Sequence, residues 1–224
     1  MSGQYLITAY IIFVMIKFKD MLNKFSITIV FISLAFLFGF RFSPNVIPIG
    51  SQLPMPDLKM KEVRGKEVSM KDCARKNGLL VMFTCNSCPY VRKNQERTKA
   101  ICTFAMQNNI GVILLNSNEE ERESDESLEA MQAYAKDQNY SWNYVVDKFN
   151  KVADAFGANR TPECFLFNSS LNLSYHGAID DNPADGENVT RQHLKEAIKE
   201  LIAGKEIAVK ESRSVGCTIH RRGA

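Results

Sequence analysis

Short apolar segments alternate with longer mixed segments through the central part of the chain. Short, continuous apolar runs are typical of strands buried inside a sheet, and longer segments with spaced apolar positions are typical of helices. The predicted strands are residues 79–83, 110–115 and 143–147, and the predicted helices are residues 89–107, 128–137 and 151–156. This alternation of strands and helices along the chain predicts an α/β fold whose sheet is covered by helices.

The pattern changes to hairpins on both sides of this region. Residues 59–63 and 66–69 flank Arg64-Gly65, and residues 163–167 and 171–175 flank a polar Asn-Ser-Ser turn. Each pair predicts two antiparallel strands, and residues 193–203 predict a last helix. Together with the central segments they predict a mixed β-sheet flanked by helices.

The first 42 residues differ from the rest, and we interpret them as a signal or membrane-anchor region. Apolar stretches at residues 5–16 and 25–40 are separated by a short charged segment, and each is shorter than the roughly 20 residues that span a bilayer. Either Met1 or Met21 serves as the start, and cleavage of the signal stays open. The prediction is an exported protein, periplasmic or anchored to the cytoplasmic membrane and facing outward. Two membrane spans with a cytoplasmic domain are the alternative.

The remaining chain divides into three predicted parts. Residues 43–53 contain Pro44 and Pro48 and are predicted to be a linker, residues 54–204 a single domain, and residues 205–224 a polar tail. The 224-residue chain has a formal net charge of +3. This charge is small and dispersed, so we expect no nucleic-acid partner.

The segment Cys85-Asn86-Ser87-Cys88-Pro89 follows the first central strand and precedes a predicted helix. Two cysteines three residues apart can form a small disulfide, and a helix N-terminus favours a thiolate. We therefore expect Cys85 at the helix start as nucleophile and Cys88 as resolving thiol. The same spacing is also half of a zinc site, but no second C-x-x-C is present, so we expect no metal.

Further motifs accompany the dithiol. Thr161-Pro162 precedes a predicted strand, and the chain also contains FTCNSCPYV, LLNSNEE, NRTPECFLF, GAIDDNP and a terminal VGCTI. In this combination the chain resembles the thioredoxin superfamily, in its redoxin branch related to alkyl hydroperoxide reductase and thiol-specific antioxidant proteins. The resemblance implies a thioredoxin-like fold in which Cys85 attacks, Cys88 resolves, and Pro162 is a cis-proline facing them. It also implies that Thr161 presents backbone groups to a bound peptide.

These features predict a thiol:disulfide oxidoreductase that acts on protein thiols or disulfides without a cofactor. A reducing or oxidising partner protein supplies or takes the electrons, and the direction of flow stays open. One alternative is a thiol-dependent peroxidase, although neither cysteine of the dithiol lies in the Pro-x-x-x-Thr-x-x-Cys pattern of that kinship. A non-enzymatic, membrane-tethered binding module is another. Cys164 and Cys217 are candidate auxiliary thiols.

Acidic residues outside the dithiol have simpler expected roles. Residues 119–129 contain seven acids and one base, and they are expected to form a solvated loop and helix start. Asp180 and Asp181 are expected to form a turn, with a proton relay near the dithiol as the less favoured interpretation.

Overall fold

The computed structural model describes residues 45–222 of the chain. The predicted signal or anchor region at residues 1–42 lies outside this part. Between residues 45 and 222, the helices are all too short or too polar to cross a membrane.

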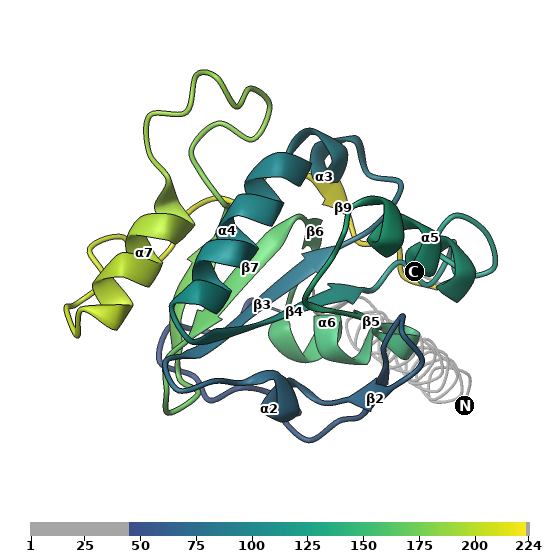
Figure 1. Ribbon diagram of the computed structural model, residues 1–224, viewed down its shortest axis with the longest axis horizontal. Helices are drawn as coiled ribbons and strands as arrows, with labels where there is room; N and C mark the ends of the chain where they lie inside the picture. Colours follow the sequence, from purple (N-terminus) through teal and green to yellow (C-terminus); the bar gives the residue numbers. More distant parts are fainter. Residues whose placement is uncertain (1–44, 223–224) are drawn as a thin grey trace, which may run out of the picture. The chain divides into compact units, whose positions relative to one another are not determined.

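A mixed five-stranded sheet forms the centre of the described part, in the order β5-β4-β3-β7-β8 (Figure 1). Its strands are β3 (Gly78–Thr84), β4 (Ile110–Asn116), β5 (Asn143–Val146), β7 (Glu163–Phe167) and β8 (Leu173–Gly177). β3, β4 and β5 are parallel, whereas β7 is antiparallel to both β3 and β8. The predicted mixed sheet is confirmed, and β3 is its central strand.

Helices cover both faces of the sheet. Side chains along β3 point alternately to the two faces, so this apolar strand contributes to a core on each side. Leu80 and Met82 pack on one face with α4 (Gln95–Gln107), α5 (Leu128–Asp137) and α7 (His193–Ile202). Val81 and Phe83 pack on the other with α2 (Met70–Cys73) and α6 (Lys151–Phe156). Both layers are built on fully buried strand residues.

The single helix predicted over residues 89–107 is two helices, α3 (Pro89–Lys93) and α4. Asn94 lies between them with φ −92° and ψ 2°, outside ordinary helical geometry. Its side-chain amide donates to the carbonyl oxygens of Tyr90 and Pro183, at 2.7 Å and 2.9 Å. The break fixes α3 as a separate short helix directly after the dithiol.

Residues 45–53, predicted to be a linker, pack on the domain. The Ile47 N–H donates to the Phe156 carbonyl at 3.0 Å, and the Gly50 N–H donates to the Leu173 carbonyl at 2.8 Å. Gly157 ends α6 with a positive φ, and a Cβ there would lie 2.2 Å from the Asn45 carbonyl oxygen. This segment therefore belongs to the folded unit, because its apolar side chains pack on the domain and its backbone forms hydrogen bonds with it.

Two small two-stranded sheets complete the fold. β1 (Met60–Lys61) and β2 (Glu67–Val68) form the predicted first hairpin. β6 (Arg160–Thr161) pairs in antiparallel fashion with β9 (Cys217–Thr218), which belongs to the predicted polar tail. Figure 1 shows β9 returning to lie beside β6, near α3. The tail is therefore packed on the domain over these residues.

Candidate active site

The dithiol lies at the carboxyl end of β3. Cys85 follows the last residue of β3 directly, and Pro89 is the first residue of α3, so Cys88 is the N-cap residue of that helix. The prediction that Cys85 lies at the helix start is therefore wrong. Proline favours the first helical position because it has no N–H to leave unpaired there, and this places the helix start after Cys88.

Thr161 contacts both sulfur atoms of the dithiol. The Cys85 Sγ lies 3.4 Å from the Thr161 hydroxyl oxygen, and the Cys88 Sγ lies 3.4 Å from the Thr161 carbonyl oxygen. The peptide bond between Thr161 and Pro162 is cis. The exposed fractions of Cys85 and Cys88 are 0% and 3%, so both sulfurs are enclosed in the described structure.

The two thiols differ strongly in acidity. A hydrogen bond from the Cys85 thiol is the largest influence on Cys88, and it lowers the pKa of Cys88 to about 4. The same contact, followed by burial, raises the pKa of Cys85. These directions favour Cys88 over Cys85 as the more acidic thiol, contrary to the expectation from the sequence, and the contact between the two sulfurs is their main cause.

Ionisation of Cys88 gives up its hydrogen bond to the Thr161 carbonyl. Four groups favour the thiolate against the cost of burial: the Cys85 thiol, the Cys217 thiol, the Val91 N–H in the first turn of α3 and the Thr161 side chain. These contacts favour a thiolate on Cys88 over one on Cys85.

A buried carboxylate, Glu126, holds the loop between the two cysteines. Its Oε2 accepts the Asn86 N–H at 2.9 Å, and its Oε1 accepts the Ser87 N–H at 3.0 Å and the Ser87 hydroxyl at 2.7 Å. Glu126 is fully buried. These contacts fix the backbone of both residues that separate Cys85 from Cys88, and the negative charge of Glu126 also contributes to the raised pKa of Cys85.

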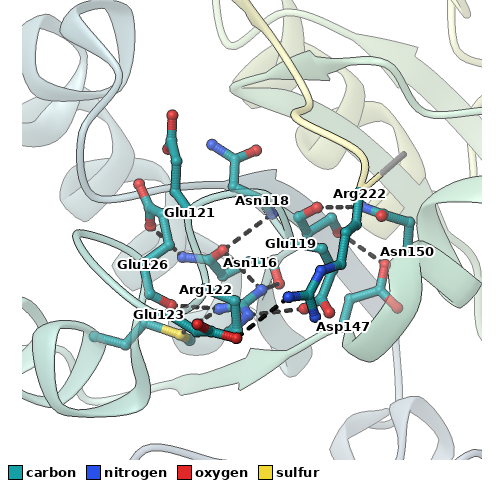
Figure 2. A network of polar contacts seen from close by, with 12 residues as sticks. Asn116, Asn118, Glu119, Glu121, Arg122, Glu123, Glu126, Asp147, Asn150 and Arg222 are labelled. Atoms are coloured by element: carbon teal, nitrogen blue, oxygen red, sulfur yellow. Dashed lines mark hydrogen bonds and ion pairs between the residues drawn. The ribbon is translucent and has the colours of Figure 1, made fainter. Parts of the chain in front are cut away.

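Neighbouring side chains hold Glu126 in place, as Figure 2 shows. The Asn116 amide donates to Glu126 Oε2 at 2.5 Å, and Arg122 donates to the Glu126 carbonyl at 2.6 Å. Arg122 also pairs with Glu119 at 2.8 Å. The expectation that residues 119–129 form a solvated loop is wrong for Glu119 and Glu126, because both are buried and fully engaged in this network.

Glu126 has no local sequence signal that marks it as part of the site. Glu126 is one of several acids in a charged run, and it lies 38 residues after Cys88 in the sequence, so spacing gives no sign of the contact. The available signal was topological. Loops after parallel strands gather at one edge of a sheet, so the segment after β4 meets the loop after β3.

The other candidate residues have different surroundings. Cys164 is fully buried in the core beneath α4 and α7, where burial raises its pKa well above the usual value, so it is an inert core thiol. Cys217, in contrast, packs against the dithiol. Asp180 forms an ion pair with Arg97 at 2.6 Å, which gives it a structural role. Among residues 45–222, no cluster of three or more histidine, cysteine or acidic side chains is arranged to hold a metal ion.

Comparison with family models places residues 51–178 in the family described as AhpC/TSA. The chain belongs to the AhpC/TSA family. This agrees with the redoxin resemblance drawn from the dithiol and Thr161-Pro162. Comparison with curated proteins gives no match.

Solved structures show the same architecture. An uncharacterized conserved protein from Geobacillus kaustophilus is 29% identical with a TM-score of 0.74, covering 80% of this chain and 95% of its own. A hypothetical protein from Sinorhizobium meliloti 1021 is 30% identical with a TM-score of 0.71, covering 80% and 98%. A thioredoxin-like protein in its oxidised form is 18% identical with a TM-score of 0.53, covering 69% and 98%. The fold of the AhpC/TSA domain is therefore thioredoxin-like.

Proposed function

We propose that this protein is a thiol:disulfide oxidoreductase whose redox pair is Cys85 and Cys88. The observation that carries the proposal is geometric: Cys85 directly follows β3, Cys88 is the N-cap of α3, and Thr161, before the cis peptide bond to Pro162, lies against both sulfurs. A thiolate is the reactive form of cysteine in disulfide exchange, and an adjacent thiol is needed to release the bound partner.

The exchange begins with the Cys88 thiolate. It attacks one sulfur of a partner disulfide, so that a mixed disulfide forms and the other partner sulfur leaves as a thiolate. Loss of the charge on Cys88 removes the contact that most strongly raises the pKa of Cys85. Cys85 then gives its proton to the leaving sulfur and attacks Cys88, which releases the reduced partner and leaves an intramolecular disulfide. These roles are the reverse of those expected from the sequence.

Residues around the pair support this cycle by holding it in place. Glu126 fixes the intervening backbone through Asn86 and Ser87, so little rearrangement is needed when the disulfide closes. Thr161 lies against both sulfurs: its hydroxyl contacts Cys85, and its carbonyl accepts from Cys88 while Cys88 is protonated. Export to the periplasm or the outer face of the membrane stays a prediction from residues 1–42.

Peroxide reduction is the second candidate function, because the chain belongs to the AhpC/TSA family. A low thiol pKa also suits attack on a peroxide. The dithiol geometry favours disulfide exchange, since a second thiol packs beside the first in one small cluster. The third alternative, a binding module with incidental cysteines, does not explain why Thr161 lies against both sulfurs of a C-x-x-C pair.

Two turnover assays on the same preparation test the proposal. One follows reduction of a model protein disulfide by dithiothreitol, and the other follows loss of hydrogen peroxide. We expect catalysis in the first assay that Cys88→Ser abolishes and that Cys102→Ser leaves unchanged, because Cys102 is buried in the core. Peroxide consumption alone, with no disulfide reduction, would instead assign the site to a peroxidase.

A further inference from the structure

The C-terminal segment brings a third thiol to the dithiol. Cys217 lies directly opposite Thr161 in the pairing of β9 with β6. It packs in the same small apolar cluster as Cys85 and Cys88. Its thiol faces that of Cys88, a contact that acts on the acidity of both groups.

Close backbone packing holds Cys217 at this position. A Cβ at Gly216 would lie 2.0 Å from the Thr161 carbonyl oxygen, so a side chain cannot be accommodated where the two segments meet. On the other side of Cys217, Ile219 is buried, and its N–H donates to the Asn159 carbonyl at 3.1 Å. Both neighbours of β9 therefore fix the register that places Cys217 opposite Thr161.

Polar contacts extend this attachment to the loop that carries Glu126. His220 Nδ1 lies 2.8 Å from a Glu121 carboxylate oxygen, and the Ser87 hydroxyl lies 3.4 Å from the other. The His220 N–H donates to Asn118 at 3.1 Å. Arg222 pairs with Glu123 at 3.2 Å (Figure 2). The segment is thus bound to the same network that positions the dithiol loop.

The three thiols differ in exposure. Cys217 is partly exposed, whereas Cys85 and Cys88 have exposed fractions of 0% and 3%. A protein thiol approaching this edge of the domain therefore meets Cys217 before it meets either member of the dithiol.

We infer that Cys217 is a third redox thiol, which forms a disulfide with Cys88 and presents it to a partner protein dithiol. This inference rests on the proposed oxidoreductase function. In this scheme the C-terminal segment carries out the exchange step that returns Cys85 and Cys88 to their reduced form.

The transfer needs no external oxidant. Starting from the Cys85–Cys88 disulfide, the Cys217 sulfur attacks Cys88, so the Cys88–Cys217 bond forms and Cys85 leaves and takes up the proton that Cys217 loses. A thiolate of the partner dithiol then attacks Cys217, and Cys88 leaves as a thiolate. The second partner thiol attacks the mixed disulfide, which restores the Cys217 thiol and leaves the partner oxidised. One disulfide is thereby reduced and one partner dithiol is oxidised.

The acidity of Cys88 supports this order of steps. A thiol of low pKa is a good leaving group in disulfide exchange. Because the pKa of Cys88 is lowered, Cys88 is the better leaving group, so attack on the Cys88–Cys217 disulfide is directed to the sulfur of Cys217, which is also the more exposed of the two residues.

Oxidation of Cys85→Ser by glutathione disulfide tests the inference. With Cys85 absent, Cys88 first forms a mixed disulfide with glutathione, and Cys217 is expected to displace the glutathione. Intact mass spectrometry should show loss of two hydrogens, and peptide mapping should find Cys88 joined to Cys217. Cys85→Ser/Cys217→Ser should instead retain one glutathione on Cys88.

A matched control and two contrary outcomes complete the test. Cys85→Ser/Cys73→Ser should behave as Cys85→Ser does, because the buried Cys73 belongs to the core on the α2 side of the sheet. Retention of glutathione on Cys88 in Cys85→Ser itself would overturn the role of Cys217 while leaving the proposed function intact. Failure of Cys88 to react in all of these folded variants would overturn the proposed function as well.

Discussion

The Glu126 carboxylate accepts the Ser87 hydroxyl at 2.7 Å and the Ser87 N–H at 3.0 Å, so a buried acid from the loop after β4 holds the turn between Cys85 and Cys88. Buried charges are retained where hydrogen bonds satisfy them, and this carboxylate receives donors from backbone and side chains alike. The relationship makes Glu126 a positioning residue for the dithiol.

Glu126→Gln should therefore destabilise the domain and disturb the redox pair. An amide offers one acceptor oxygen, and its NH₂ group would face backbone N–H groups, so we expect a loss of about 1.5–3 kcal/mol in the free energy of unfolding. Removal of the charge should also make Cys85 more acidic. Urea unfolding and the pH dependence of Cys85 alkylation measure the two effects.

Glu129→Gln is the matched control for this change. Glu129 is exposed in the first turn of α5, so its substitution should alter stability by no more than about 0.5 kcal/mol. Equal effects of the two substitutions would show that Glu126 does not hold the loop.

Cys88 should be the first cysteine to react with iodoacetamide at neutral pH. Its pKa is lowered from 9.0 to about 4, so the reactive thiolate persists at neutral pH and is lost only as the pH falls toward 4. Cys85→Ser should shift this midpoint upward, because the Cys85 thiol is the largest cause of the lowered value. Peptide mapping across a pH series measures the shift; faster labelling of Cys85 would restore the order of roles expected from the sequence.

Gly216→Ala should detach β9 from β6. The added Cβ would lie 2.0 Å from the Thr161 carbonyl oxygen, and backbone cannot yield as a flexible side chain can. We expect a loss of about 1–3 kcal/mol and faster alkylation of Cys217 in the folded protein. Gly186→Ala is the control, since its Cβ would meet only the Arg97 side chain, at 3.3 Å. Unchanged Cys217 reactivity in Gly216→Ala would contradict the tight packing of this segment.

Removal of residues 1–53 should cost more stability than removal of residues 1–44. The longer truncation deletes partly buried Val46, Ile47 and Ile49 together with the hydrogen bonds to Phe156 and Leu173. We expect a difference of at least ~2 kcal/mol from lost apolar burial. Thermal unfolding of the two truncated proteins measures it, and equal melting temperatures would show that residues 45–53 act as a linker after all.

Much of the fold could be predicted from the sequence because its elements are encoded locally. The apolar run at residues 79–83 fits only a buried strand, and β3 is the central strand; the limits predicted for α5 and α6 agree with the structure. The start of α3 also agrees with the predicted helix start at residue 89, because Pro89 favours the first helical position.

The remainder of the site depends on contacts between distant segments. Glu126 and Cys217 reach the dithiol through sheet topology and through the pairing of β9 with β6, and neither residue has a distinctive local pattern. The acidity of Cys88 likewise arises from the Cys85 and Cys217 thiols and the Val91 N–H together. The sequence alone singles out the dithiol as a candidate redox pair, whereas a role for each sulfur requires the folded geometry.

The most direct test of the account is an equilibrium titration of the Cys85–Cys88 pair in glutathione buffers of graded redox potential. The free thiols are alkylated after acid quenching, and the disulfide is mapped by mass spectrometry. We expect a reversible two-electron transition that is the same from the oxidising and the reducing side, and that Cys88→Ser abolishes. Absence of a Cys85–Cys88 disulfide at every potential, in a protein shown to be folded, would contradict the assignment of this site as a thiol:disulfide redox centre.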